Sequence, residues 1–112
     1  MPKPALRPDE REIETYRANR SQGSRAVGGH LLLTDQRLLF YPHRFDSSTG
    51  GINWACDLRS VTNVGLAARG RNPFDGSMRR RLRIECAEEI GLFVVNKAES
   101  IAAAIRSAAA RH

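Results

Sequence analysis

The stretch GGHLLLTDQRLLFYP, residues 28–42, decides the fold of this 112-residue chain. It consists of two apolar runs around the short polar connection Asp35–Gln36. Pro42 ends the second run because proline cannot donate a hydrogen bond to a β-ladder. Two apolar runs around a tight turn predict a β-hairpin, with strands over 25–34 and 37–42. The centre of this hairpin carries no catalytic-looking side chain, so we interpret it as scaffold.

Five further segments on either side of the hairpin predict strands. The clearest is INWACDL (52–58), in which Ile52, Trp54, Cys56 and Leu58 share one face at a period of two. This alternation places Trp54 in the core. The other four segments are 12–19, 60–68, 81–87 and 92–95. Polar turns or loops separate them at 20–24, 43–51, 69–80 and 88–91.

The period changes near the end of the chain and predicts one helix, from Lys97 to Arg111. Apolar residues recur there at helical spacing, namely Ile101, Ala104, Ile105 and Ala108. Asn96 and Glu99 have the spacing of a capping box, which predicts the start of the helix.

Seven short strands followed by one amphipathic helix predict a mainly β domain. A small antiparallel sheet buries its apolar face and protects its edges by closing into a barrel, and the helix can cover an open end. Residues 1–11 contain three prolines and alternating charges, which indicates a flexible lead-in. The domain is therefore expected over residues 12–112.

The charge of the chain indicates which classes of partner it can bind. The formal net charge is +6, and of 18 cationic residues only Lys3 and Lys97 are lysines. An arginine-rich surface suits phosphate or carboxylate groups, since the guanidinium fork pairs with both. Lipid, nucleic acid and acidic protein partners all remain compatible with this charge.

Two observations predict a cytoplasmic location. The N-terminus has no apolar segment typical of a secretion signal, and no apolar run approaches the roughly 20 residues that span a bilayer. Cys56 and Cys86 are too few for a disulfide framework and lack metal-ligand spacing, so we interpret them as two buried thiols.

The hairpin also carries a family resemblance. Its residues match the pattern G-x-L-x-L-T-x-x-R-L-x-F of GRAM domains, which belong to the pleckstrin-homology-like (PH-like) superfold. The matching residues are Gly29, Leu31, Leu33, Thr34, Arg37, Leu38 and Phe40. The segment INWACDLRSVTNV resembles the next element of the family, and the likeness covers about residues 10–111.

This resemblance implies seven strands in two nearly orthogonal sheets, capped by the C-terminal helix. It also implies a module that binds anionic lipids, peptides or protein partners rather than an enzyme. The family's lipid signature, basic residues on the first two strands and their loop, has an imperfect counterpart in Arg17, Arg20 and Arg25.

A second cationic group lies in the long loop before the 81–87 strand. It surrounds Phe74 and consists of Arg69, Arg71, Arg79, Arg80 and Arg81. In some PH-like domains an anion site lies between these two loops, so the pairing resembles a known arrangement. An exposed Phe74 among cations suits insertion into an anionic membrane. The alternative is a solvated basic face with Phe74 packed onto the barrel.

The sequence offers little support for other chemistries. His30, His43 and His112 lie far apart along the chain, and no cysteine–histidine pair accompanies them, so we predict no catalytic site, no metal site and no cofactor. The expected helix is alanine-rich with few cations, which argues against sequence-specific nucleic-acid recognition.

These observations lead to one hypothesis and one alternative. We expect a non-catalytic module that binds anionic phospholipid through the two arginine-rich loops, at the inner face of a cytoplasmic membrane. The alternative is an adaptor that binds a peptide or a partner domain at a strand edge or beside the helix.

Overall fold

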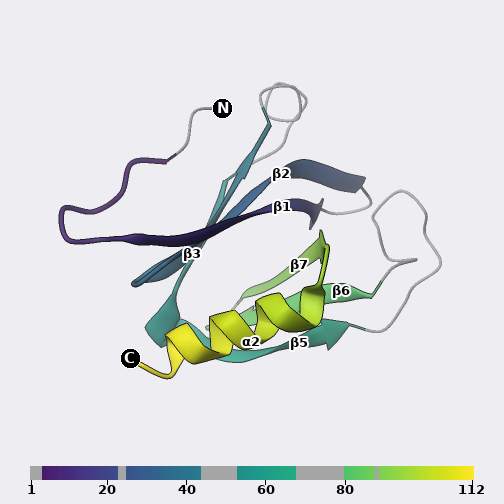
Figure 1. Cartoon of the computed structure of the whole chain (residues 1–112). Coiled ribbons are helices and arrows are strands. Elements are labelled where there is room, and N and C mark those ends of the chain that lie inside the picture. Colours follow the sequence, from purple (N-terminus) through teal and green to yellow (C-terminus); the bar gives the residue numbers. More distant parts are fainter. Residues whose placement is uncertain (1–3, 23–24, 44–52, 68–79, 88) are drawn as a thin grey trace.

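The computed structural model describes residues 4–22, 25–43, 53–67, 80–87 and 89–112. These residues form seven strands, a short 3₁₀ helix and one α-helix (Figure 1). The strands are β1 (Glu12–Gln22), β2 (Arg25–Thr34), β3 (Arg37–Pro42), β4 (Trp54–Asp57), β5 (Val61–Ala67), β6 (Arg81–Cys86) and β7 (Glu89–Val95). The helices are η1 (Leu58–Ser60) and α2 (Ala98–Ala109).

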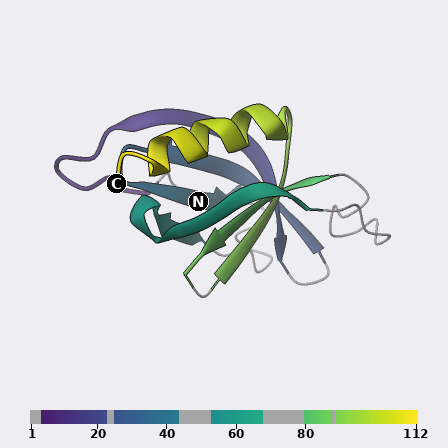
Figure 2. The ribbon, with the colours of Figure 1, turned by 90° about the horizontal axis from the view of Figure 1, so that it is seen from below.

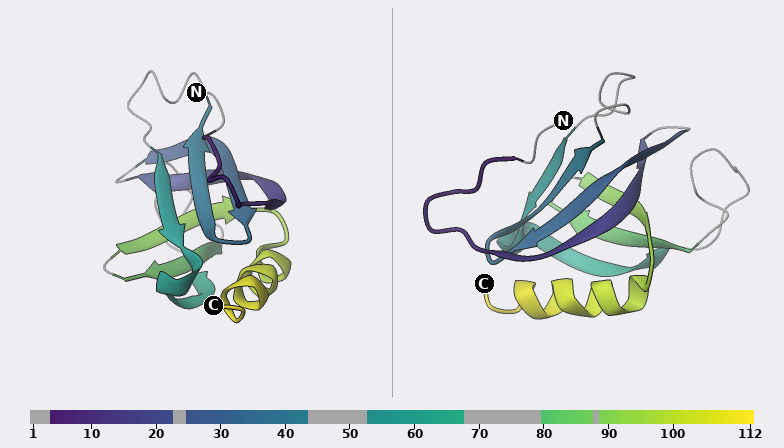
Figure 3. Two further views of the ribbon diagram at one scale, coloured as in Figure 1. Left: turned by 90° about the vertical axis from the view of Figure 1, so that its left-hand side faces the viewer. Right: turned by 45° about the horizontal axis from the view of Figure 1, so that its top comes forward.

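All seven strands belong to one antiparallel sheet with the order β4-β3-β2-β1-β7-β6-β5. The expected seven-stranded antiparallel fold with one C-terminal helix is confirmed, but the two nearly orthogonal sheets are parts of one continuous sheet. The two halves are joined by hydrogen bonding between β1 and β7, over the pairs Ala18–Val95, Asn19–Val94 and Arg20–Phe93. The sheet curves so strongly that its two halves face each other across the core, as Figure 3 shows. Its edge strands are β4 and β5.

The core lies between the two halves of the curved sheet and under α2. Alternate residues of each strand point inward, so the predicted hydrophobic faces are confirmed: Leu31, Phe40 and Phe93 have no exposed surface, and Trp54 is 5% exposed. The Trp54 and Phe93 rings meet edge to face at 5.2 Å between centroids. The helix packs on β5, β6 and η1 and buries Ile101, Ala102, Ile105 and Ala108 (Figures 1 and 2).

Two local expectations about α2 and the turn before β7 are wrong. The residue that precedes the helix is Lys97, in a left-handed conformation with φ 55°, and no side chain caps the helix there. The expected Asn96–Glu99 capping box is therefore absent from this part of the structure. The last strand starts at Glu89 rather than at residue 92, because the turn is tight and uses Ala87 at φ 47°.

The contacts of Thr34 and Arg37 explain why the hairpin motif contains these two residues. The Thr34 hydroxyl donates to Glu10 Oε2 at 2.6 Å and accepts the backbone N–H groups of Gln36 and Arg37. The Arg37 guanidinium donates from Nε and Nη2 to the two oxygens of Glu10, at 2.8 and 2.9 Å. We call Glu10, Thr34 and Arg37 the clasp. The glycine of the motif, Gly29, allows β3 to approach closely, since a Cβ atom there would lie 2.7 Å from Pro42 Cα.

The clasp changes the interpretation of the N-terminal segment. The sequence indicated a flexible lead-in over residues 1–11, but the Glu10 side chain has no exposed surface. The hydrogen bond to Arg37 holds the pKa of this carboxyl at about 2, against the opposing effect of burial. Arg7 extends the attachment through an ion pair with Asp57 at 2.9 Å.

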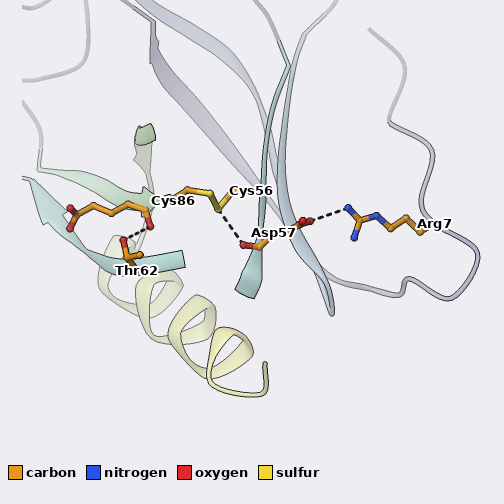
Figure 4. Close-up of a disulfide and its surroundings, with 6 residues drawn as sticks. Arg7, Cys56, Asp57, Thr62 and Cys86 are labelled. Atoms are coloured by element: carbon orange, nitrogen blue, oxygen red, sulfur yellow. Dashed lines mark hydrogen bonds and ion pairs between the residues drawn. A yellow bond between two sulfur atoms is a disulfide. The ribbon is translucent and has the colours of Figure 1, made fainter. Parts of the chain in front are cut away.

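The interpretation of the cysteines as two buried thiols is wrong. Cys56 on β4 and Cys86 on β6 form a disulfide (Figure 4). Both side chains point into the barrel, because Cys56 shares its face with Trp54 and Cys86 shares its face with Ile84. The bond therefore connects edge strand β4 to the strand beside the other edge and closes the barrel where the edges do not pair.

Candidate anion-binding site

The candidate site lies on the outer face of the sheet, the face turned away from the core. Ala18 is buried in the core, so its neighbours Arg17 and Asn19 point outward from β1. Leu82 is also in the core, so Arg81 points outward from β6. Arg17 and Asn19 are exposed, and Arg81 is half-buried.

A direct hydrogen bond joins the two chain segments that carry the predicted arginine loops. Arg81 Nη1, at the start of β6, donates to Ser21 Oγ, near the end of β1, at 2.9 Å. The two residues are 60 positions apart in the sequence. Figure 1 shows the C-terminal ends of β1 and β5 on the same side of the molecule, with the C-terminus on the opposite side. The stems of both loops therefore meet at one end of the barrel.

A polar cavity lies beside this contact, between β1 and β7. It has a volume of about 220 Å³ and is lined by Arg17, Ala18, Asn19, Val94, Val95 and Asn96. The pairs Asn19–Val94 and Leu82–Phe93 place Arg81 next to Val94, on the rim of the cavity. The lining supplies one guanidinium and two amide side chains, which can all donate to the oxygens of an anion.

The arginines near this end retain unused donors. Arg20 Nη1 and Arg81 Nε are both buried, and within the described residues neither has a hydrogen-bond partner. Arg20 pairs with Phe93 and therefore faces the barrel mouth rather than the outer face. Burial lowers the pKa of Arg20, and the charge of Glu89 opposes this shift. Unpaired buried donors are costly, and a bound anion could satisfy them.

The remaining predicted site residues are only partly placed. Arg80 is exposed just before β6, and the backbone of Arg25 pairs with Gln22 at the start of β2. Arg69, Arg71, Arg79 and the membrane-tip candidate Phe74 lie outside the described residues. Of the eight predicted arginines, the structure thus brings Arg17 and Arg81 to one face and directs Arg20 to the mouth.

Two residues of the cavity were not predicted from the sequence. Asn19 follows Arg17 at the period of a strand, so alternation alone could have placed it on the same face. Asn96 had been assigned to a helix cap instead. Its place beside Asn19 depends on the pairing of β1 with β7, which no local pattern predicts.

The described part of the chain contains neither a candidate metal site nor a helix that could span a membrane. Among those residues, no group of three or more histidine, cysteine, aspartate or glutamate side chains has the arrangement of a metal site. None of the helices described there is long and apolar enough to cross a membrane.

Comparison with known proteins bears on the fold. No family model matches the chain, and no curated protein matches its sequence. The Vps36 N-terminal PH domain matches with a TM-score of 0.69 and 16% identity, over 97% of this chain and 86% of that one. The fold is PH-like. The GRAM assignment within this fold class stays a prediction from the hairpin motif.

Two further solved structures are similar to this chain. One is the C-terminal domain of an unknown protein from Leishmania infantum, with a TM-score of 0.67 and 13% identity over 89% of this chain and 84% of that one. The other is the DH/PH domain of human ARHGEF11, in a ternary complex with human RhoA and its inhibitor. It has a TM-score of 0.63 and 13% identity, and the match covers 92% of this chain and 30% of that one.

Proposed function

We propose that the chain is a non-catalytic, GRAM-type module that binds the surface of anionic membranes through the outer-face site. Arg17, Arg81, Asn19 and Asn96 bind phosphate groups of the lipids, and Arg20 supports them from the barrel mouth. Arg25 and the arginines of the 69–80 segment add cations around this site, and Phe74 inserts among the lipid chains.

The observation that supports this proposal most strongly is the contact between Arg81 and Ser21. It joins the end of β1 to the start of β6, which are the described stems of the two predicted arginine loops. The charge of the chain acts in the same direction, since +6 attracts an anionic surface.

Vesicle co-sedimentation tests the proposal. The full chain is mixed with neutral phosphatidylcholine vesicles and with vesicles that contain increasing fractions of phosphatidylglycerol. We expect binding to rise with the anionic fraction and to fall with salt. The double variant R17A/R81A should bind about 25-fold more weakly, since each arginine near an anionic surface contributes about five-fold.

A matched control separates the site from overall charge. Arg59 is an exposed arginine on η1, directly before the first residue of β5, whereas Arg81 pairs with Ala67 at the last residue of β5, so R59A removes one charge away from the site. R59A should bind nearly as well as the unaltered chain, and its circular dichroism and Tm should match. Equal losses in R59A and in the single variant R81A would contradict the proposal, as would binding that ignores vesicle charge.

The cellular location stays a separate prediction. The sequence predicted the inner face of a cytoplasmic membrane together with two free thiols, and the disulfide argues against this location because cytoplasmic disulfides are rare. Alkylation of the chain in acid-quenched cells measures the state of Cys56 and Cys86. Modified thiols would support the cytoplasmic location, and resistance to alkylation would place the chain in an oxidising compartment.

A second candidate function rests on the groove between edge strand β5 and α2. This groove has a volume of about 360 Å³, and an added strand from a partner peptide could pair with the edge of β5. Arg106 occupies part of that edge, since its Nε and Nη2 donate to the Val64 carbonyl at 3.0 and 2.6 Å. Pull-down in lipid-free buffer discriminates the two functions, because an adaptor retains its partner there.

A further inference from the structure

Two histidines meet on the outer face of the sheet, directly beside the proposed anion site. His30 on β2 pairs with Arg17 on β1 and with Tyr41 on β3. His43, just after β3, donates its backbone N–H to the Gly28 carbonyl at 2.8 Å and therefore continues the same ladder. Residues 28, 30, 41 and 43 thus share one face with Arg17.

The rings of these residues are in contact. His30 stacks on Tyr41 with 5.3 Å between ring centroids, and it meets His43 edge to face at 5.0 Å. His30 is half-buried and His43 is exposed, so the Tyr41 ring holds one imidazole in place while the other faces solvent. This cluster is a feature that the sequence analysis did not assign, because the two histidines are 13 positions apart.

The charges around the pair have one sign. Among the described residues, the charged or titratable side chains that face His30 are Arg17 from β1, Tyr41 from β3 and His43 after it. Burial lowers the pKa of His30, and the neighbouring His43 and Arg17 lower it further. The His30 imidazole is therefore mainly neutral near pH 7 and gains its charge only at more acidic pH.

We propose that His30 and His43, together with Arg17, form an acid-activated anion site that strengthens binding to anionic membranes at low pH. Protonation of the His30 imidazole adds a second cation to the patch, beside Arg17. The mutual repulsion of these two cations is relieved when the patch binds the phosphate of a lipid headgroup. The inference rests on the proposed membrane binding and extends the same outer face, since Arg17 belongs to both sites.

The chemistry of the patch favours this ligand. A protonated imidazole donates from both ring nitrogens, and Arg17 adds a guanidinium. Ring contacts hold His30, so little side-chain freedom is lost when a phosphate binds to it.

The experiment compares co-sedimentation at pH 7.4 and pH 5.0. The vesicles contain phosphatidylglycerol in phosphatidylcholine, because the charge of phosphatidylglycerol hardly changes between these values. We expect up to about five-fold tighter binding at pH 5.0, since one added charge near the surface contributes about that much. In H30Q/H43Q this gain should disappear, while binding at pH 7.4 stays unchanged. In H30K/H43K the tight binding should persist at both pH values.

His112 supplies the matched control. It is an exposed histidine at the opposite end of the barrel, where its Nε2 lies 2.8 Å from the Asp35 carbonyl oxygen. H112Q should keep the full pH response. A full pH response in H30Q/H43Q would overturn the histidine site. Binding of the unaltered chain that does not depend on pH would also overturn it, but would leave the proposed function intact. Binding only at pH 5.0 supports the histidine site and contradicts the function at neutral pH. No binding at either pH overturns both.

Discussion

The two ends of the barrel differ in how completely their arginine side chains are paired. At the clasp, Arg37 is held by both oxygens of Glu10, and its side chain is 17% exposed. At the anion-binding end, Arg20 and Arg81 each bury a nitrogen without a partner in the described structure. The residue type is the same, but only one end satisfies its donors within the chain.

This difference separates a stabilising role from a binding role. A buried charge that is fully paired holds two segments together, and removing its partner is costly. A buried donor without a partner reduces stability, and the cost is recovered when a ligand supplies the missing acceptor. We therefore expect changes at the clasp end to alter stability and changes at the other end to alter binding.

The largest loss of stability is expected from removal of the disulfide. This bond lies toward the clasp end of the barrel, because Cys56 is the neighbour of Asp57. The bond closes a loop with a sequence separation of 30, which corresponds to about 4 kcal/mol of unfolding free energy. Urea unfolding of C56A/C86A should show this loss. Dithiothreitol should destabilise the unaltered chain by a similar amount and leave the variant unaffected. An unaltered chain that is insensitive to reductant during unfolding would contradict the prediction.

The next largest effect is expected from Glu10→Ala. This change removes the carboxylate that accepts from the Arg37 guanidinium and from the Thr34 hydroxyl, at a cost of about 3 kcal/mol. Asp9→Ala is the control, because Asp9 lies in the same segment and its hydrogen bond to Gln36 is exposed. Equal midpoints in urea for the two variants would show that the clasp does not stabilise the fold.

The clasp should also produce a defined acid response. The pKa of Glu10 is lowered from 4.5 to about 2 in the folded chain. Its contribution to stability is therefore fully present above pH 4.5 and is lost as the pH falls toward 2, by up to about 3 kcal/mol. Unfolding free energies measured between pH 5 and pH 2 should fall more steeply for the unaltered chain than for Glu10→Gln. Parallel slopes would disprove the role of this carboxyl.

The smallest effect, and one of opposite sign, is expected from Arg20→Met. Methionine fills the barrel mouth next to Phe93 without a buried unpaired donor, so stability should rise by about 0.5–1 kcal/mol. Binding to anionic vesicles should weaken by up to about five-fold, since one cation is lost. The matched change Arg37→Met should instead destabilise the chain. A loss of stability in both variants would remove the contrast between the two ends.

Local patterns were sufficient for most of the secondary structure. The strands 25–34 and 37–42 were predicted with the observed boundaries, because apolar runs, a tight connection and Pro42 all act within a few residues. The helix and its buried isoleucines followed from a period of 3.6 in the same way. The left-handed conformation of Lys97 did not follow, because the sequence there indicated a capping box at Asn96 and Glu99 instead.

The sequence by itself thus determined the seven strands, the terminal helix, the hydrophobic core and the arginine-rich charge. Only the tertiary structure decided which distant residues meet: Cys56 with Cys86, Glu10 with Arg37, Arg81 with Ser21 and His30 with His43. The physical reason is that periodicity and turn chemistry act over a few neighbouring residues. These contacts depend instead on strand order and register, which place residues side by side whatever their separation along the chain.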